Sequence, residues 1–494
     1  MKQIFSEEAR DIEIFDECDI LIVGGGSAGH SAAIAAARAG AKNIILLERY
    51  GYMGGDVTGG YVIMVPHLSY KNLQYVRGIQ EEWFTRLSKV PGAVVGPEGS
   101  EIGSIKKDDI YKWLPFWDAT SNCPDSPKRV VRSVYFEPNQ LKIEMDKMLV
   151  EERDRIRVYC HCWACRPIME KNQVKGVIFE SKEGRKAILA KTVIDATGDG
   201  DIFCQTGAPY NDDKESDVAR NVSTALVFRL GGIDFDKFFR YNMAHPEAFG
   251  KIAGGLQQFV KGNRIMPIPS ERNDVCWMNN WIQPMDCTGI KDLTETEMMV
   301  RTNIREMIAF LQENAEGFKD AFLYDIAPQL GARCSKRLDG EYVLTPMDFV
   351  NHREFDDVIA WHSTICRLND SAPIEIPYRV ILPKKVDNLL CPGRHASADP
   401  ISFDWVGLIP QCIGTGQAAG IAAAVATDLG TNVRNVDIAR VQDILVEQDV
   451  PLPRRKDVDP EYTELLKENN YGLYTALAKE AKDNPEAILK FRQF

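Results

Sequence analysis

Apolar and polar positions near the N-terminus follow the pattern of a strand, a helix and a second strand. Residues 19–23 (DILIV) form a short apolar run that ends in the three glycines 24–26. The stretch SAGHSAAIAAARAGA follows, with small residues wherever a helix would press on a sheet. Residues 43–47 (NIILL) form a second apolar run. This pattern predicts a β-α-β unit with a glycine turn, the unit from which parallel sheets are built.

The next part of the chain first loses this rhythm and then regains it. Residues 61–129 carry clusters of Pro, Gly and charged residues, and we interpret them as an insertion. Residues 136–154 have helical spacing. The apolar runs that follow predict short strands at residues 156–160, 174–180, 187–190 and 192–195.

The C-terminal half combines a mixed segment with a return of the first pattern. Residues 219–324 are rich in aromatic residues and methionine, and a helix is predicted around 295–313. We interpret this segment as a second domain inserted into the first. Strand and turn signals return at 386–393, followed by a glycine-opened helix at Gly414 and a charged, helical tail from about residue 433.

Composition indicates a globular protein with two or more structural units. Of the 494 residues, 45% are hydrophobic and 26% are charged, and the formal net charge of −12 disfavours a nucleic-acid partner. The N-terminus has no continuous apolar segment, and no stretch approaches the ~18 to 20 apolar residues of a membrane helix. Twelve cysteines without an export signal are typical of reduced thiols. We therefore expect a cytoplasmic protein that does not insert into membranes.

The glycine turn carries the first chemical motif. Residues 24–29 (GGGSAG) form a G-x-G-x-x-G in which Gly24 allows a tight turn, Gly26 lets the backbone approach a pyrophosphate, and Gly29 lets helix and strand pack closely. The pyrophosphate would lie on the helix N-terminus, beside Ser27 and Ala28. Glu48 follows about 20 residues later, where an acid takes the ribose hydroxyls. The motif predicts a dinucleotide site.

Glycine pairs after the second strand distinguish between dinucleotides. Arg49 follows Glu48, and Gly54-Gly55 and Gly59-Gly60 come next. A glycine pair lets the chain run flat beside a long, bent cofactor, so FAD is favoured over NAD. A flexible loop is the alternative interpretation of these glycines.

A later strand runs into a second motif, residues 194–201 (IDATGDGD). Ala196, Thr197 and Gly198 permit close backbone contact with a cofactor at the carboxyl end of the sheet. Asp199 and Asp201 either bond polar groups of the cofactor or cap the next helix, and both interpretations stay open.

The C-terminal motifs are a strand that ends in Gly393-Arg394 and the helical segment Gly416-Gln417-Ala418. A helix N-terminus directed at the flavin would stabilise the negative charge that builds on reduction. A plain helix that starts with glycine is the alternative.

Together, VGGGSAG, ER, VIDATGDGD, NLLCPGR and GTGQAAGIAAA resemble the FAD-dependent oxidoreductase family with a glutathione-reductase-type FAD-binding domain. The nearest branch is bacterial, with one FAD domain and no separate NAD domain. The resemblance covers residues 19–60, 131–210 and 325–425. It implies non-covalent FAD held by Gly24, Gly26, Gly29, Glu48, Arg49, Gly198, Gly393 and Arg394. Relatives carry an arginine shortly before a Pro-x-Cys step, whereas this chain has Asp404, which weakens the case for a carboxylate substrate.

The predicted fold class is α/β, a Rossmann-like FAD-binding domain assembled from discontinuous segments with an inserted α+β substrate domain. The FAD-binding domain takes residues 1–65, 131–218 and 346–430. Residues 66–130 are an insertion, residues 219–345 form the substrate or cap domain, and residues 431–494 are a C-terminal helical tail.

Candidates for proton transfer lie near the C-terminal motifs. His395 and Asp404 are the catalytic candidates, His395 first, because histidine is the usual proton carrier near neutral pH. Arg337, Tyr342 and His67 are candidates for substrate binding. A purely structural role is the alternative for each of them.

Cysteines at 160, 162 and 165 form a C-x-C-x-x-C with soft thiolate ligands of the kind that bind zinc or iron–sulfur clusters. A fourth cysteine at motif spacing is missing, and buried free cysteine behaves as a small apolar residue. We therefore predict no metal.

The predicted function is hydride transfer between FAD and a small polar organic substrate, catalysed by a dehydrogenase or reductase. The chain has no second complete G-x-G-x-x-G, so the electron donor or acceptor is expected to be external. The alternatives are an FAD-dependent monooxygenase and an electron-transfer subunit with a metal at the C-x-C-x-x-C segment. A non-catalytic FAD-binding scaffold and assembly into a homo-oligomer also stay open.

Overall fold

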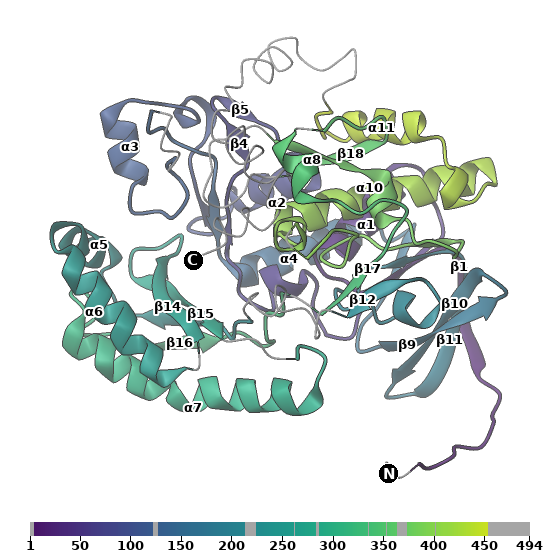
Figure 1. Ribbon diagram of the computed structural model, residues 1–494, viewed down its shortest axis with the longest axis horizontal. Coiled ribbons are helices and arrows are strands. Elements are labelled where there is room, and N and C mark those ends of the chain that lie inside the picture. Colours follow the sequence, from purple (N-terminus) through teal and green to yellow (C-terminus); the bar gives the residue numbers. More distant parts are fainter. Residues whose placement is uncertain are drawn as a thin grey trace.

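The computed structural model describes residues 4–121, 127–212, 224–260, 262–282, 286–333, 335–351, 353–362, 373–400 and 402–452. Two sheets dominate these segments, one on each side of the molecule (Figure 1). In the described part of the chain, no helix combines the length and the apolar character needed to cross a membrane.

The larger sheet has seven strands and is parallel at its centre. β1 lies between β2 and β11 and is parallel to both, and β8 and β20 extend the parallel part. β10 and β9 add an antiparallel extension beyond β11. The strands are β1 (Glu13–Val23), β2 (Ile44–Leu47), β8 (Ile156–Tyr159), β9 (Trp163–Glu170), β10 (Gln173–Ser181), β11 (Gly184–Asp195) and β20 (Leu389–Leu390). The two strands predicted at 187–190 and 192–195 are one strand, β11.

Both faces of the central strands are buried, as in parallel sheets covered on both sides. Ile20 and Ile22 of β1 point into one apolar cluster, and Leu21 and Val23 point into another. Helices α1 (Ser27–Arg38) and α10 (Ile409–Leu429) pack together over the first face. Helix α10 begins five residues before the predicted start at Gly414, because Pro410 occupies its first turn, where a missing N–H is tolerated.

The second sheet is antiparallel and belongs to the predicted substrate domain. Its order is β14-β15-β13-β16, and it encloses a core of its own with the helices beside it. Figure 1 shows α5, α6 and α7 on the outer side of this sheet, away from β1 and β11. The elements are β13 (Phe228–Gly231), α5 (Phe235–Ala244), α6 (Pro246–Leu256), β14 (Gly262–Pro269), β15 (Val275–Ile282), α7 (Ile290–Asn314) and β16 (Phe322–Ile326).

Smaller elements fill the seam between the two sheets and the periphery. The predicted insertion contributes β6 to a small sheet of order β3-β7-β6, and it also contains α2 and α3. These elements are β3 (Met64–Val65), β4 (Ser69–Tyr70), β5 (Leu73–Gln74), α2 (Ile79–Leu87), β6 (Val94–Val95), α3 (Lys107–Trp113), β7 (Val134–Phe136), α4 (Pro138–Glu151), β12 (Tyr210–Asp212), β17 (Lys336–Leu338), α8 (Pro346–Val350), β18 (Val358–His362), β19 (Ile374–Pro377), α9 (Phe403–Val406) and α11 (Ile438–Glu447).

A buried arginine joins the two main parts of the fold. Arg229 of β13 is 1% exposed and lies 2.5 Å from a carboxylate oxygen of Glu137, the residue that caps α4. Its second nitrogen lies 2.5 Å from Asp325 of β16. The guanidinium is also 5.0 Å from the ring centroids of Tyr61 and Tyr324. These contacts fix the second sheet against the first.

Candidate cofactor site

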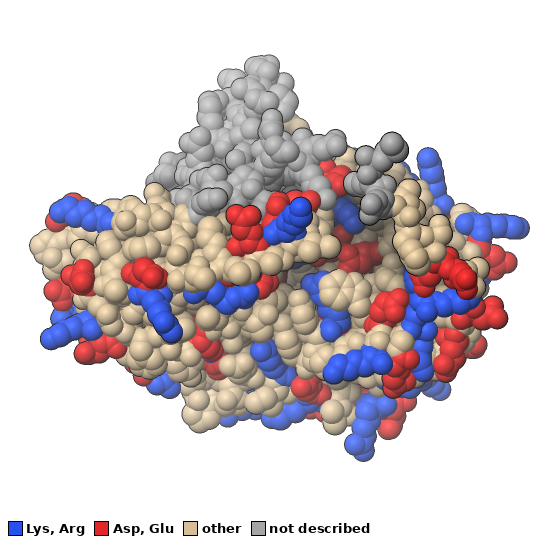
Figure 2. Space-filling model, turned by 90° about the horizontal axis from the view of Figure 1, so that it is seen from below, with Lys and Arg blue, Asp and Glu red and all other residues tan. Residues whose placement is uncertain are grey.

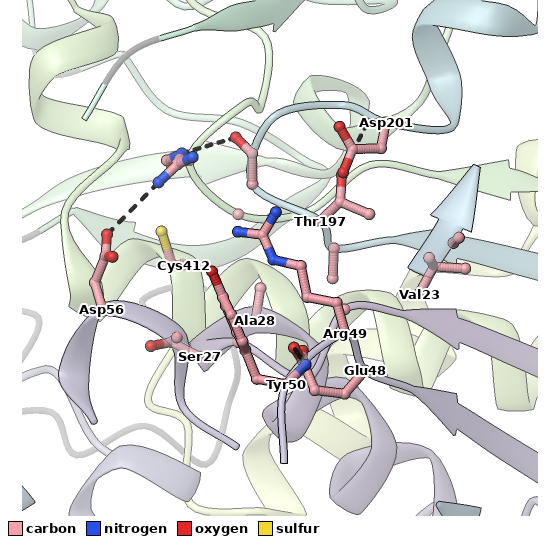
Figure 3. Close-up of a pocket in the computed structure, with 18 of the residues that line it drawn as sticks. Val23, Ser27, Ala28, Glu48, Arg49, Tyr50, Asp56, Thr197, Asp201 and Cys412 are labelled. Atoms are coloured by element: carbon pink, nitrogen blue, oxygen red, sulfur yellow. Dashed lines mark hydrogen bonds and ion pairs between the residues drawn. The ribbon is translucent and has the colours of Figure 1, made fainter. Parts of the chain in front are cut away.

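A deep cleft opens at the carboxyl ends of β1, β2 and β11, where ligands of such sheets bind (Figure 3). It encloses about 930 Å³ of empty space, part of it open to solvent. Its lining comes from four parts of the chain that are far apart in sequence. The lining includes Val23, Gly24, Gly26, Ser27, Ala28, Leu47, Glu48, Arg49, Tyr50, Gly55, Asp56, Cys162, Trp163, Ala164, Ala196, Thr197, Gly198, Asp201, Gln329, Gly393, Arg394, Gly407, Ile409 and Cys412.

The glycine turn after β1 forms one wall of the cleft. Gly24 has φ +95°, and a Cβ there would lie 2.7 Å from the carbonyl oxygen of Ala196. A Cβ at Gly29 would lie 1.7 Å from the carbonyl oxygen of Gly24, so helix and turn touch. At Gly26 the nearest atom to a Cβ is the Cα of Gly55, 4.0 Å away. Gly26 therefore keeps open space beside the N-terminus of α1, where a pyrophosphate would accept backbone N–H groups.

Glu48 lies at the end of β2, on the floor of this part of the cleft. Its carboxylate accepts hydrogen bonds from the backbone N–H of Gly25 at 2.5 Å and of Tyr50 at 2.8 Å. Burial raises the pKa of Glu48 above its usual value, even though these two bonds oppose the shift. The backbone thus fixes the carboxylate at the position from which it can accept hydrogen bonds from ribose hydroxyls.

Aromatic and cationic side chains flank this end of the cleft. The Arg49 guanidinium lies 4.9 Å from the ring centroid of Tyr50 and 5.2 Å from that of Trp163. These planar groups offer stacking surfaces for a ring system, which a dinucleotide has at each end.

The opposite end of the cleft lies at the N-terminus of α10. Gly407, Ile409 and Cys412 line it, so the first turn of the helix opens into the cavity. The free N–H groups and the helix dipole favour negative charge there. This arrangement fits the prediction that a helix N-terminus is directed at the flavin, although the residues involved precede the predicted Gly414.

Arg394 crosses the cleft at this end. Its Nε donates to the carbonyl oxygen of Gly198 at 2.7 Å, and Nη1 donates to the carbonyl oxygen of Ala332. Its Nη2 lies 2.5 Å from Asp199, and Nη1 lies 3.6 Å from Asp56. Burial acts to lower the pKa of Arg394, but the two carboxylates outweigh burial and raise it. The guanidinium therefore stays charged.

These features fit a long dinucleotide with an acidic partner at the ribose end and a helix N-terminus at the other. Residues 19–445 match the family described as FAD dependent oxidoreductase. The chain belongs to this family. This FAD-dependent oxidoreductase is an enzyme that binds FAD, and its α/β architecture is the predicted fold class.

Two curated relatives match parts of this oxidoreductase. Urocanate reductase from Eggerthella lenta is 46% identical over 52 residues, which cover 10% of this chain and 8% of the relative. Digeranylgeranylglycerophospholipid reductase from Sulfolobus acidocaldarius is 24% identical over 211 residues, which cover 41% of this chain and 40% of the relative. The matches thus span less than half of either relative.

A solved structure resembles the whole chain at low identity. It is a geranylgeranyl bacteriochlorophyll reductase-like protein from Thermoplasma acidophilum, 15% identical with a TM-score of 0.44, and the alignment covers 96% of both chains.

The structure brings most of the predicted cofactor-binding residues of this oxidoreductase to the cleft. Gly29 and Gly54 do not line it, but both shape its wall. Gly54 has φ +106°, and a Cβ there would lie 2.4 Å from the Thr58 hydroxyl. The predicted residues that line the cleft are Gly24, Gly26, Ser27, Ala28, Glu48, Arg49, Gly55, Ala196, Thr197, Gly198, Gly393 and Arg394.

Three predicted cofactor-binding residues lie elsewhere. Gly416 packs against α1, since a Cβ there would lie 2.2 Å from the carbonyl oxygen of Ala28. The Gln417 side chain bonds to the backbone N–H of Ile79 and to Gln448, and Ala418 is fully buried. These small residues serve helix packing, so their expected contact with FAD is corrected.

His395 does not line the cleft, so its assignment as the proton carrier gains no support from the structure. Its Nε2 donates to the carbonyl oxygen of Asp195 at 3.0 Å, and its ring packs against Phe203 at 5.0 Å. Burial lowers the pKa of His395, so the ring is neutral. Asp404 belongs to α9, but its side chain lies outside the part that the structure describes.

The three predicted substrate residues also lie away from the cleft lining. Arg337 is buried, donates to the carbonyl oxygen of Ala398 and lies 5.6 Å from the ring centroid of Phe403. Tyr342 donates to Asp348 in a separate surface pocket. His67 is fully buried between β3 and β4, beside Asp118. Their assignment to the substrate therefore gains no support from the structure.

The three cysteines of the C-x-C-x-x-C segment occupy a turn and the start of β9, not one continuous strand. The Cys162 thiol donates to the carbonyl oxygen of Cys160, and the Cys165 thiol donates to that of Ile178, both at 3.3 Å. Among the described residues, no group of three or more His, Cys, Asp or Glu side chains is arranged to hold a metal ion.

Asp56, Gln329 and Cys412 line the cleft and were not predicted from the sequence. Asp56 directly follows the glycine pair Gly54-Gly55, and that position is a signal that could have identified it. Gln329 reaches the cleft from the far side of the substrate domain, and nothing in its local sequence indicates this.

Proposed function

We propose that this oxidoreductase is a dehydrogenase or reductase that transfers a hydride between FAD and a small polar organic substrate. The observation that carries the proposal is the end of the cleft where the N-terminus of α10 meets Arg394. A flavin bound here supplies the hydride chemistry, while the helix N-terminus and the guanidinium stabilise the negative charge that accompanies reduction.

The polar character of the substrate is inferred from the side chains at this end. Asp56, Asp199, Gln329 and Arg394 present carboxylate, amide and guanidinium groups that are linked by hydrogen bonds and ion pairs. Such groups bind polar molecules and penalise apolar ones, because an apolar ligand leaves them desolvated and unpaired. Both curated relatives carry the name reductase, which supports the reductase direction.

The electron partner is proposed to be external, because the sequence holds no second complete G-x-G-x-x-G. We also propose a cytoplasmic location, in keeping with the twelve cysteines. Acidic and basic side chains are interspersed on the face shown in Figure 2, which supports the absence of a nucleic-acid partner. A homo-oligomer is compatible with all of these features.

An anaerobic screen of candidate substrates tests the proposal. Without oxygen, a substrate that donates a hydride bleaches the oxidised flavin, and an artificial electron acceptor restores the absorbance over many turnovers. A substrate that accepts a hydride restores the absorbance of flavin that has first been reduced chemically. The control is Gly26→Val, which fills the space kept for the pyrophosphate and should carry no flavin. Turnover that requires oxygen and yields a hydroxylated product would contradict the proposal and favour a monooxygenase. Stoichiometric iron and sulfide in the purified protein would favour an electron-transfer subunit.

A further inference from the structure

Arg394 holds two carboxylates in the cleft, and it holds them unequally. Nη2 of Arg394 lies 2.5 Å from Oδ1 of Asp199, and the Ser335 hydroxyl donates to the same oxygen at 2.6 Å. Oδ2 of Asp56 lies 3.6 Å from Nη1, beyond hydrogen-bond distance. Gln329 donates to Oδ1 of Asp56 at 3.2 Å. Asp199 therefore forms the tight ion pair, and Asp56 is the second, loosely held anion.

The two environments move the protonation of these carboxyls in opposite directions. Burial acts to raise the pKa of Asp199, but Arg394 and Ser335 outweigh burial and lower it. Burial also raises the pKa of Asp56, and there burial together with the nearby Asp199 prevails over Arg394 and Gln329. When the pKa values of two neighbouring carboxyls are shifted in opposite directions, one carboxyl typically stays charged and the other carries a proton.

Asp56 has a fixed place at the end of the cleft where α10 begins. Figure 3 shows Asp56 beside Cys412, with Asp201 on the opposite side beyond Thr197. Gly54 and Gly55, with φ +106° and +58°, form the turn that carries Asp56. A Cβ at Gly60 would lie 3.0 Å from Oδ1 of Asp56, so the carboxyl also packs closely against the following loop.

Charge balance at this end changes when the flavin is reduced. Arg394 supplies one positive charge to two carboxylates, so ionisation of both Asp199 and Asp56 leaves these three side chains with a net negative charge. Additional negative charge on the cofactor in a low-dielectric cleft raises the cost of keeping Asp56 ionised. Binding a proton removes that cost.

We propose that Asp56 is the side chain that takes up a proton when the bound flavin is reduced and releases it on reoxidation. Two electrons and one proton reach the flavin, either together as a hydride from a donor or as electrons from an electrode with a proton from solvent. A further proton from solvent forms an O–H bond with the Asp56 carboxylate. On reoxidation the electrons leave and the same O–H bond breaks. This inference rests on the redox role given under the proposed function, but it is independent of the substrate.

The test counts protons without using a substrate. The flavin midpoint potential of the FAD-loaded protein is measured by spectroelectrochemistry as a function of pH, and its slope gives the number of protons bound per two electrons. Asp56→Asn should bind one proton fewer than the wild type across the pH range in which Asp56 titrates. The control Asp146→Asn removes a carboxylate on α4 outside the cleft lining and should keep the wild-type slope.

Two outcomes would overturn the inference. One is a wild-type slope in Asp56→Asn. The other is loss of the proton in Asp201→Asn instead, since Asp201 also lines the cleft and burial raises its pKa to about 6. The substrate screen and the proton count fail separately: a substrate that bleaches the flavin upholds the proposed function even if Asp56→Asn keeps its slope.

A second variant leaves Asp56 in place and decides the matter if Asp56→Asn does not retain FAD. Gln329→Met removes a hydrogen-bond donor that lowers the pKa of Asp56. The pH at which the slope of the midpoint potential against pH changes should therefore be higher in Gln329→Met than in the wild type. No movement, or movement to lower pH, would contradict the role of Asp56.

Discussion

Gly416 of α10 lies directly against Ala28 of α1, so that an added Cβ would come within 2.2 Å of the Ala28 carbonyl oxygen. One turn later, a Cβ at Gly420 would lie 2.1 Å from the carbonyl oxygen of Ala32. The two helices touch along their backbones, and this contact sets the position of the α10 N-terminus at the cleft.

Replacing Gly416 with alanine should destabilise the protein by about 1–3 kcal/mol, because the methyl group must push two packed helices apart. Denaturant unfolding of the FAD-loaded protein measures the loss. The matched control is Gly254→Ala in α6, where a Cβ has no atom within 4 Å, and its stability should be unchanged or slightly higher. Equal stability of the two variants would show that α1 and α10 are not in this close contact.

The sequence predicts well those parts of the site that are formed by residues close together in the chain. Gly24, Gly26 and Glu48 lie within one β-α-β unit, where strand, turn and helix leave few geometries for the chain. The three-part assembly of the domain followed from the spacing of similar motifs. The Gly416 segment shows the limit, because small residues suit both a cofactor and a neighbouring helix, and periodicity does not state which partner the helix face meets.

Contacts between distant segments account for what the sequence analysis missed. Arg394 is recognisable as a motif residue, but its partners Asp199 and Asp56 come from two other stretches of the chain. His395 follows Arg394 directly in the turn after Gly393, yet its ring faces Phe203 in the core. Only the packed structure shows that Arg394 lines the cleft and that His395 does not.

Replacing Gly26 with valine should abolish FAD binding while the fold persists. The nearest atom to the added Cβ is 4.0 Å away, so the side chain enters the open cleft and takes the space of the pyrophosphate. Flavin absorbance of the purified protein should be lost, and added FAD should bind at least about tenfold more weakly, which corresponds to about 1.4 kcal/mol. Gly250→Val, at an open position on α6, should retain flavin. Normal flavin content in Gly26→Val would contradict the placement of the cofactor.

Replacing Arg229 with alanine should cost about 3–5 kcal/mol of stability, because it leaves Glu137 and Asp325 as partly buried carboxylates without their partner. Chemical unfolding measures the loss, and limited proteolysis should show cleavage between the two sheets. Arg272→Ala removes an exposed ion pair with Asp274 and should cost less than about 1 kcal/mol. A similar small effect in Arg229→Ala would mean that this ion-pair network does not hold the domains together.

His67 and Asp118 should give the stability of this protein an unusual pH dependence. Nε2 of His67 lies 3.6 Å from Oδ2 of Asp118. Burial lowers the pKa of His67 to about 3 and raises the pKa of Asp118 to about 7. Between about pH 4 and pH 6.5 the unfolded chain carries one proton on the histidine, and the folded chain carries one on the aspartate. The pair therefore contributes little net slope, because folding moves a proton without binding or releasing one.

Single substitutions should expose the two opposite slopes. In Asp118→Asn only the lowered pKa of His67 remains, so stability is full above about pH 6.5 and falls by up to about 1.4 kcal/mol per pH unit as the pH drops. In His67→Asn, whose side chain tolerates the φ of +64° at this position, only the raised pKa of Asp118 remains. Stability should then be greatest below about pH 4 and fall as the pH rises to about 7. Urea unfolding at a series of pH values measures both slopes, with exposed His245→Asn as the control. Slopes of the same sign in the two variants would contradict the opposite shifts in pKa that burial gives His67 and Asp118.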